Sequence, residues 1–182
     1  MNEFFDVLNA NGEYTNEVAS RDECHRKGLY HKAVVVFIVS EDNERVLLQQ
    51  RSSTKKLWPN LWDITAGGHV LSNELGYQAV IRETKEEIGI DLDKSSLEFI
   101  GATTSENLSG DIINRHFNEF YIVHKDVDLK DIVLQKDEVQ DIKWFEKDEV
   151  IRRVNNNYEN LTDKIGCWNY LLKYFEINNI KK

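Results

Sequence analysis

Runs of apolar residues separated by short polar segments predict a chain made largely of strands. Residues 33–39 (AVVVFIV) form a continuous β-branched run, which is typical of a strand buried on both faces. Further strands are predicted at residues 3–8, 46–51, 61–65, 97–106, 116–124 and 139–145. Turns are expected at residues 9–12, where Gly12 permits a positive φ, and at residues 41–44.

Two segments have the spacing of helices. Residues 73–89 are predicted to form an acid-rich helix, with Ser72 or Asn73 as its N-cap and Gly89 as the residue that ends it. Residues 162–177 carry aromatic and aliphatic side chains at helical intervals, which predicts an amphipathic helix that packs on the sheet. The expected fold is therefore a strand-rich α/β or α+β sandwich with few helices.

Length and charge narrow the class of protein. The 182 residues contain no linker-like tract, so we expect one domain over residues 1–182, with residues 1–20 as an N-terminal extension and a C-terminal helix within 160–178. A formal net charge of −9 without a basic stripe argues against broad binding to nucleic acid or to anionic membranes. The chain has no run of 18 apolar residues, and Cys24 and Cys167 form no paired motif, so a cytoplasmic protein is expected.

Three carboxylates share one face of the acid-rich helix. At about 100° per residue, Glu83, Glu86 and Glu87 fall within an arc of roughly 100°, with Arg82 beside them. Like charges at this spacing repel, and a hard divalent cation such as Mg²⁺ or Mn²⁺ would remove that cost, hold phosphate oxygens and lower the pKa of a bound water. The alternative is an ordinary solvated face, which is what acid clusters on helices usually are.

The spacing of this segment resembles the Nudix box, G-x5-E-x7-R-E-U-x-E-E-x-G-U with U aliphatic. The matching positions are Gly68, Glu74, Arg82, Glu83, Glu86, Glu87, Gly89 and Ile90. Thr84 departs from the pattern where an aliphatic residue is usual, and its β-branched side chain is able to pack in the same place. Eight positions in fixed register favour the box over the solvated face.

The resemblance implies a Nudix fold, in which helices sandwich a mixed sheet, and hydrolysis of a nucleoside diphosphate derivative or a similar diphosphate. It implies that Glu83, Glu86 and Glu87 bind the metal with the carbonyl of Gly68, and that Glu87 is the most essential of them. Arg82 would orient a glutamate, and Glu74 would be a supporting acid. The general base is one of these acids or a loop acid, for which Glu119 and Glu138 are minor alternatives.

Residues outside the box resemble the isopentenyl-diphosphate isomerase branch of the same superfamily. This similarity covers roughly residues 10–125 and is carried by residues 21–33, 47–52 and 56–62. It implies an alternative isomerase-like activity. The branch's protonating cysteine is replaced by Gly67, which has no proton to transfer, so hydrolysis is favoured over isomerisation. A third alternative is a non-catalytic module that senses a nucleotide.

In that branch histidines bind a metal, and His31 and His69 fall at matching positions with His25 nearby. Two interpretations of these three residues stay open: they form a second metal site, or they are separate core or polar histidines. His116 and His124 are expected to be ordinary strand residues.

Substrate contacts are expected from loops. Trp58 is the candidate to stack on a base, and Arg51 and Lys56 are candidates to meet the diphosphate. Residues 52–60 and 104–118 are the loops expected to read the remaining moiety. Trp62, Trp144 and Trp168 are expected in the core. The implied partner is a small-molecule diphosphate, and a homodimer is one alternative for the oligomeric state.

Overall fold

A computed structural model describes residues 3–110 and 112–179, and its centre is a seven-stranded mixed sheet. Strand β3 (His31–Val39) pairs in parallel with β8 (Ile112–His124) and antiparallel with β4 (Arg45–Arg51). The strand order is β5-β4-β3-β8-β7, and β6 and β9 pair with β3 and β4 outside that path. The remaining strands are β5 (Trp62–Asp63), β6 (Ala66–His69), β7 (Glu98–Ser109) and β9 (Val139–Glu146). The apolar run at residues 33–39 is thus the middle of the sheet, as its composition predicts.

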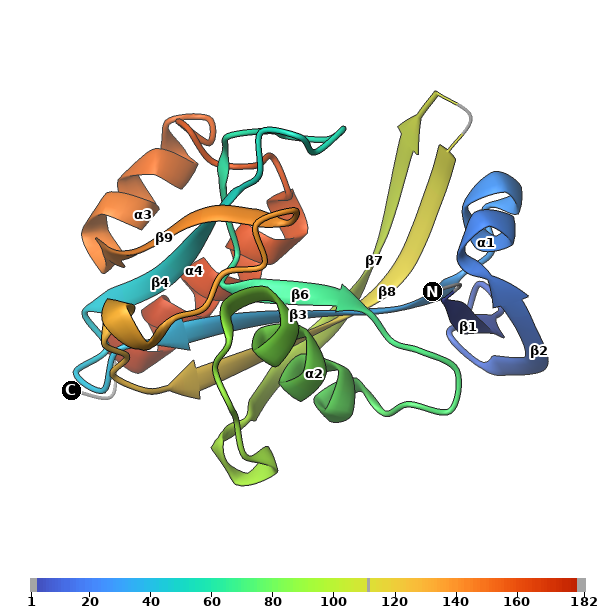
Figure 1. The fold of residues 1–182 in the computed structure, drawn as a ribbon, viewed down its shortest axis with the longest axis horizontal. Coiled ribbons are helices and arrows are strands. Elements are labelled where there is room, and N and C mark those ends of the chain that lie inside the picture. The colour runs from blue at the N-terminus through green and yellow to red at the C-terminus, as the bar shows by residue number, and fades with distance from the viewer. Residues whose placement is uncertain (1–2, 111, 180–182) are drawn as a thin grey trace.

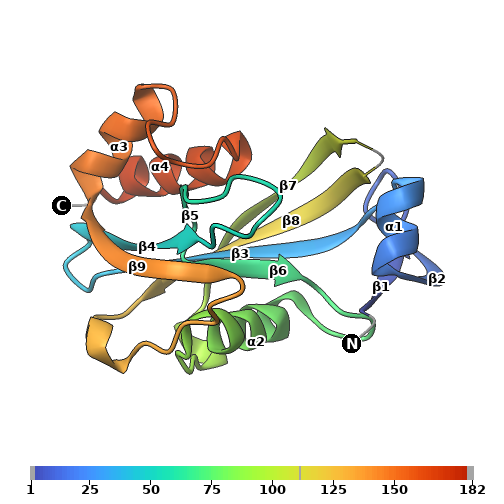
Figure 2. The same ribbon diagram turned by 45° about the horizontal axis from the view of Figure 1, so that its top comes forward.

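Helices cover both faces of this sheet (Figures 1 and 2). They are α2 (Gly76–Ile88), α3 (Lys147–Asn155) and α4 (Ile165–Asn179). Val80 of α2 packs with Val34 on one face, and Trp168 of α4 packs with Phe37 on the other. Neighbouring residues of β3 point to opposite faces, so the one strand contributes to both cores. This is the predicted sandwich of a mixed sheet between helices. Among the described residues, no helix combines the length and the apolar character needed to cross a bilayer.

A separate N-terminal unit lies against one end of the sheet (Figure 1). We use this name for β1 (Phe4–Leu8), β2 (Tyr14–Ser20) and α1 (Arg21–Lys27), in which the two strands form a two-stranded sheet of their own. Its small core consists of Phe5, Val7, Ala19 and Cys24. The side chain of Ser20 caps α1, and Gly28 ends it in the left-handed conformation at φ 64°. The sequence pattern predicts β1 but neither β2 nor α1.

Helix α2 begins later than predicted, and neither expected cap is used. The hydroxyl of Ser72 and the backbone N–H of Asn73 both donate to the carboxylate of Asp6, at 2.6 and 3.2 Å. Both residues therefore tie the preceding turn to β1, and Leu75 is the N-cap residue instead. Gly89 ends the helix at φ 76°, as predicted.

Three other predictions need correction. The strand predicted at residues 61–65 is only the two-residue β5, and the glycine pair that follows lies within a separate strand, β6. Residues 104–118 are mostly strand, because the β7–β8 hairpin is longer than predicted. Of the tryptophans expected in the core, only Trp168 is fully buried, whereas Trp62 and Trp144 are half-buried against the two core clusters. Helix α3 has no counterpart among the predicted elements.

Candidate active site

The three carboxylates on α2 lie in one pocket of about 270 Å³, which we call the acid pocket. Its lining contains Glu83, Glu86 and Glu87. The other residues that line it are Glu3, Arg21, Arg51, Lys55, Gly67, Gly68, His69, Gln135 and Glu138. The buried side chains of Ala79, Val80, Thr84 and Ile88 anchor the helix to the sheet. This packing turns the acidic face toward the pocket.

Arg82 holds two acids of α2 and the preceding Glu74 in place. Its guanidinium donates to Glu74 at 2.9 Å, to Glu83 at 2.7 Å and to Glu86 at 3.3 Å. It also donates to the backbone carbonyl of His69 at 2.9 Å, which links the helix to β6. Burial alone would lower the pKa of Arg82, but the hydrogen bond to Glu74 and the charge of Glu83 raise it, so the side chain stays a cation. The fork geometry of arginine suits this role, because it offers several donors in one plane.

Glu87 is the most deeply buried of the three carboxylates. Its side chain accepts hydrogen bonds from the Gln49 amide and from the Gly67 backbone N–H, both at 3.2 Å. Burial, together with the nearby charge of Glu83, raises the pKa of Glu87 to about 8. Burial also raises the pKa of Glu83, although Arg82 acts to lower it. A cation bound next to Glu83 and Glu87 would favour the ionised form of both carboxyls.

Gly68 leaves space that any other residue would fill. A Cβ atom added at Gly68 would lie 2.3 Å from Oε1 of Glu83. The backbone of β6 therefore approaches the carboxylate face of α2 as closely as a glycine allows. Carboxylate and carbonyl oxygens are what Mg²⁺ and Mn²⁺ prefer, so the donor set of Gly68, Glu83, Glu86 and Glu87 fits such an ion.

Cations stand opposite the acids. Arg21 comes from α1, Arg51 from the end of β4 and Lys55 from the following loop, and all three line the acid pocket. Lys55 forms an ion pair with Glu138, one of the two loop acids singled out from the sequence. The other, Glu119, does not line the pocket; it binds Lys32 at 3.0 Å and accepts a hydrogen bond from Tyr121.

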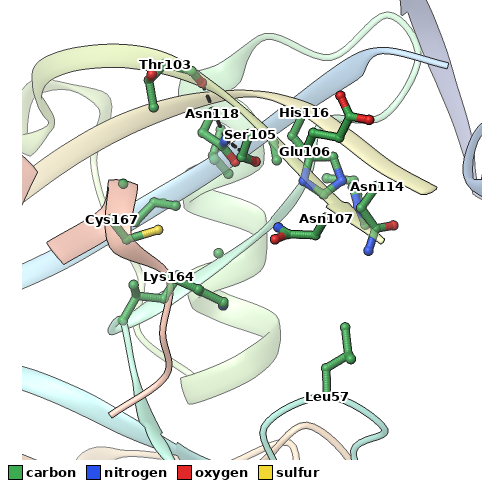
Figure 3. Close-up of a pocket in the computed structure, with 18 of the residues that line it drawn as sticks. Leu57, Thr103, Ser105, Glu106, Asn107, Asn114, His116, Asn118, Lys164 and Cys167 are labelled. Atoms are coloured by element: carbon green, nitrogen blue, oxygen red, sulfur yellow. Dashed lines mark hydrogen bonds between the residues drawn. The ribbon is translucent and has the colours of Figure 1, made fainter. Parts of the chain in front are cut away.

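A second, wider pocket of about 490 Å³ adjoins the first, and both are lined by Arg21, Arg51, Gly67, Gly68 and His69. Figure 3 shows this wide pocket, with hydroxyl, amide and imidazole side chains of the β7–β8 hairpin on one side and Leu57 across from them. Asn118 on its wall donates to Ser105 at 2.9 Å. Trp58 lines the wide pocket, whereas Lys56 is exposed and lines neither pocket. Lys55 occupies the place that the sequence analysis gave to Lys56.

A buried carboxylate fixes Arg51. Asp63 accepts from Arg51 at 3.1 Å, from Lys164 at 2.6 Å and from Thr162 at 3.0 Å. Burial alone would raise the pKa of Asp63, but Lys164 and Arg51 hold it below its usual value. This network joins β5 to the segment before α4, and it keeps the Arg51 guanidinium where the two pockets meet. Periodicity alone does not indicate Asp63, because a lone acid in a short strand has no distinguishing pattern.

Four histidines meet beside β6 and form what we call the histidine cluster: His25, His31, His69 and His116. One ring nitrogen from each lies within 4.8 Å of the other three. Burial lowers the pKa of His31 to about 4 and that of His116 to about 3, so both imidazoles are neutral at pH 7. Burial also lowers the pKa values of His25 and His69.

The two histidines of β8, His116 and His124, lie in different surroundings. The prediction that His116 is an ordinary strand residue is wrong, because its register opposite His31 brings it into the cluster. His124 lies outside the cluster and hydrogen-bonds to Tyr174 at 2.6 Å. Isolated histidines in a strand carry no signal of this kind, so only the pairing of β3 with β8 reveals the fourth member.

Comparison with known proteins gives a consistent picture. A family model described as the NUDIX domain matches residues 29–165. Nudix hydrolase 3 of Arabidopsis thaliana is 38% identical over 151 residues, which are 81% of this chain and 20% of that protein. The chain thus spans about a fifth of that relative's length. An uncharacterized Nudix hydrolase of Listeria monocytogenes is 36% identical over 148 residues, with 81% of this chain and 82% of that protein covered.

Solved structures share the fold at lower identity. A protein from Deinococcus radiodurans superposes with a TM-score of 0.65 at 19% identity, covering 85% of this chain and 90% of its own. The MutT protein of Methanosarcina mazei gives a TM-score of 0.63 at 22% identity, covering 82% of this chain and 95% of its own.

Proposed function

The chain belongs to the NUDIX domain family and is a Nudix pyrophosphohydrolase, and from this premise we propose that it hydrolyses the diphosphate linkage of a nucleoside diphosphate derivative or similar organic pyrophosphate with Mg²⁺ or Mn²⁺. The observation that carries the proposal is the acid pocket. Three glutamates of α2, two of them held by Arg82, face three cationic side chains there, beside the glycine pair of β6.

Four groups would hold the metal: the carboxylates of Glu83, Glu86 and Glu87 and the carbonyl of Gly68. When bound, such an ion neutralises phosphate oxygens and lowers the pKa of a bound water. Arg82 acts as a positioning residue, because it fixes the rotamers of Glu83 and Glu86 and ties them to β6.

The remaining polar groups bind the substrate. Arg21, Arg51 and Lys55 would offset the charge of the diphosphate where the two pockets meet. The organic moiety would enter the wide pocket, with Trp58 stacking on it. Water attacks phosphorus, a phosphate ester leaves, and a carboxylate of the acid pocket takes the proton from the water. The base is one of the α2 glutamates or the loop acid Glu138, because Glu119 does not line the acid pocket.

The isomerase-like alternative draws on one observation, the assembly of His25, His31 and His69 beside the acid pocket. Gly67 argues against it. This glycine stands where a protonating side chain would be needed, and a Cβ atom there would lie 2.4 Å from the carbonyl oxygen of Val34. The sensor alternative predicts the same pockets without turnover.

The family and the charge of the chain also bear on its partners and its cellular location. The family acts on small-molecule diphosphates, and the charge of −9 favours such a substrate, bound through metal and local cations, over nucleic acid. We expect a cytoplasmic protein that does not bind membranes. A homodimer is an alternative to a monomer, because the edge strand β7 exposes Phe99 and Leu108.

The test is release of phosphate or pyrophosphate with Mg²⁺ across nucleoside di- and triphosphates, nucleotide sugars, dinucleoside polyphosphates and isopentenyl diphosphate. Glu87→Gln should lower kcat about 1000-fold, which is about 4 kcal/mol of activation free energy. Glu149→Gln is the matched control, because Glu149 is a helix glutamate that pairs with Arg153 and lines neither pocket. Isomerisation without release would favour the isomerase, and ligand-induced thermal stabilisation without turnover would favour the sensor.

A further inference from the structure

One wall of the wide pocket is a two-stranded surface of polar side chains on β7 and β8, which we call the polar ladder. Alternate residues of a strand share a face, and the antiparallel register sets each of them opposite a partner on the neighbouring strand. The cross-strand pairs are Thr103 with Asn118, Ser105 with His116 and Asn107 with Asn114, and all six residues line the wide pocket (Figure 3). Polar side chains in register along one wall indicate a surface that meets a polar ligand.

The ladder has hydrogen-bonding groups left for a ligand. The amide of Asn118 donates to the hydroxyl of Ser105 at 2.9 Å, and a hydroxyl that accepts a hydrogen bond still has its own proton to donate. In the part of the chain that the structure describes, Oδ1 of Asn114 is buried and accepts no hydrogen bond. A buried acceptor without a partner is costly, so a ligand that donates to Asn114 gains a bond that the free protein lacks.

The remaining lining of the wide pocket is partly apolar. Val35, Ile64 and Phe120 contribute buried side chains, and Leu57 stands across from the ladder (Figure 3). A ligand in this space of about 490 Å³, which is within the range of small-molecule sites, therefore meets hydrocarbon as well as hydrogen-bonding groups. A sugar ring has the same division, because its hydroxyls project from the edge of the ring and its C–H groups form the two faces.

Other organic groups match this lining less well. An alkyl chain would displace water from the ladder without replacing the hydrogen bonds of that water. A flat base presents its donors and acceptors along its edges in one plane, whereas the ladder spreads polar groups over two strands about 4.8 Å apart and over about 13 Å along each strand. Hydroxyls on several carbons of a ring fit such a spread better.

The position of the ladder determines which part of the substrate it meets. Arg51, Gly67 and Gly68 line both pockets, so a diphosphate bound at the acid pocket ends where the wide pocket begins. The group within reach of the ladder is therefore the one bonded directly to the diphosphate. In a nucleoside diphosphate this group is ribose, and in a nucleotide sugar it is either the ribose or the second sugar.

We propose that the polar ladder binds the hydroxyls of a sugar ring joined directly to the diphosphate, and that Asn114 is a specificity-determining residue that accepts a hydrogen bond from one of them. This inference rests on the proposed hydrolysis, whose substrate it narrows to a sugar-bearing diphosphate. The ladder contains none of the groups that would hold the metal. Changing it therefore alters which substrate is bound and leaves the attack of water on phosphorus in place.

The experiment compares ADP, 2′,3′-dideoxy-ADP and isopentenyl diphosphate as substrates with Mg²⁺. In the wild type, loss of the two ribose hydroxyls should lower kcat/KM about tenfold or more, and isopentenyl diphosphate should be poorer still. In Asn114→Leu the ratio between ADP and its dideoxy analogue should shrink to about twofold, because leucine accepts no hydrogen bond. Arg115→Gln is the matched control and should keep the wild-type ratio, since Arg115 is the next residue of the same strand, pairs with Glu106 and lines neither pocket.

A second arm identifies which sugar the ladder reads. UDP-glucose and UDP-2-deoxyglucose are compared in the same three proteins. A ratio that depends on Asn114 in this arm assigns the second sugar, and one that depends on it in the ADP arm assigns the ribose. The wild-type ratios need no variant to fold, and calorimetry with Glu87→Gln measures the same dependence on hydroxyls by binding alone.

The outcomes separate this inference from the proposed hydrolysis. The inference is overturned, with the hydrolysis intact, by equal kcat/KM for hydroxylated and deoxy substrates in both arms or by isopentenyl diphosphate as the best substrate. A ratio that Asn114→Leu leaves unchanged in both arms also overturns it. No release from any substrate, combined with hydroxyl-dependent binding that Asn114→Leu abolishes, would overturn the hydrolysis and keep the ladder. No release and no hydroxyl-dependent binding would overturn both.

Discussion

The acid pocket and the histidine cluster sit beside the same short strand, yet their polar groups are satisfied in opposite ways. At the acid pocket Arg82 donates hydrogen bonds to Glu83 and Glu86 as well as to the neighbouring Glu74, and Glu87 accepts two hydrogen bonds. In the cluster the Nε2 atoms of three histidines have no partner within the described residues. The first site is therefore largely preorganised by the protein, whereas the second leaves buried nitrogens without a hydrogen bond. Removing a side chain should cost much stability in the first and little in the second.

The largest effect is expected for Arg82→Met. This change leaves the part-buried carboxylates of Glu74 and Glu83, each 14% exposed, without their cation, and removing one partner of a buried ion pair typically costs about 3–5 kcal/mol. Urea unfolding should show that loss, and kcat should fall about 100-fold because Glu83 and Glu86 lose their common anchor. Arg153→Met, which removes a similar pair on α3 away from both pockets, should cost about 1 kcal/mol or less. Equal losses in the two variants would contradict the role given to Arg82.

The next largest effect, expected for Glu87→Gln, is a gain in stability and not a loss. Burial raises the folded-state pKa of Glu87 from 4.5 to about 8, so the folded chain holds this proton more tightly than the unfolded chain does. Its contribution to stability is complete below pH 4.5 and is lost as the pH rises through about 8. In chelator, Glu87→Gln should therefore be more stable than wild type at pH 8, by on the order of 3 kcal/mol.

Unfolding in urea at pH 5 and pH 8 measures the effect, and the gap between variant and wild type should widen with pH. Glu86→Gln is the control, because Glu86 is half-exposed and should show little change. A gap that stays constant between the two pH values would argue against a buried, reluctantly ionised Glu87.

A smaller effect is expected for Gly68→Ala. The added methyl would press on the Glu83 carboxylate, which must then rotate away from the position that Arg82 fixes. The Mg²⁺ concentration that gives half-maximal activity should rise about tenfold, or about 1.4 kcal/mol. Gly166→Ala should leave it unchanged, since its methyl meets Thr103 at an ordinary 3.6 Å. An unchanged metal requirement in Gly68→Ala would count against Gly68 as part of the metal site.

The smallest effect is expected within the histidine cluster. In chelator, His116→Leu should change the free energy of unfolding by less than about 1 kcal/mol, because it removes an unpaired buried nitrogen and keeps most of the apolar volume. Chemical unfolding beside the Arg82→Met protein makes the contrast direct. A loss of several kcal/mol from His116→Leu would mean that the protein alone already satisfies the cluster.

The same contrast explains what could be predicted from the sequence. The acids that line the acid pocket from α2 belong to one helix, so their spacing along the chain already determines that they share a face. The central strand at residues 33–39 was equally predictable, because both its faces are apolar. Local patterns of this kind need no knowledge of tertiary contacts.

The parts that could not be predicted depend on contacts between distant segments. His116 joins the cluster only because β8 pairs in parallel with β3, in a register that sets it beside His31. Ser72 and Asn73 fail as caps because β1, far away in the chain, offers them the carboxylate of Asp6. Lys55 rather than Lys56 lines the acid pocket because a loop without a repeating pattern decides which way each side chain points.

The alternating side chains of β6 limit where residues can be inserted into the chain or deleted from it. Gly68 pairs with Val34 and faces α2, whereas His69 pairs with Ala33 and faces the histidine cluster, so adjacent residues serve opposite sides of the sheet. Inserting or deleting one residue just before β6 would invert these faces and abolish both sites in one step. The loop at residues 70–75 offers no such freedom either, because Ser72 and Asn73 are bonded to Asp6 and Glu74 is paired with Arg82. Insertions and deletions therefore conserve or destroy the two sites together, and only substitutions separate them.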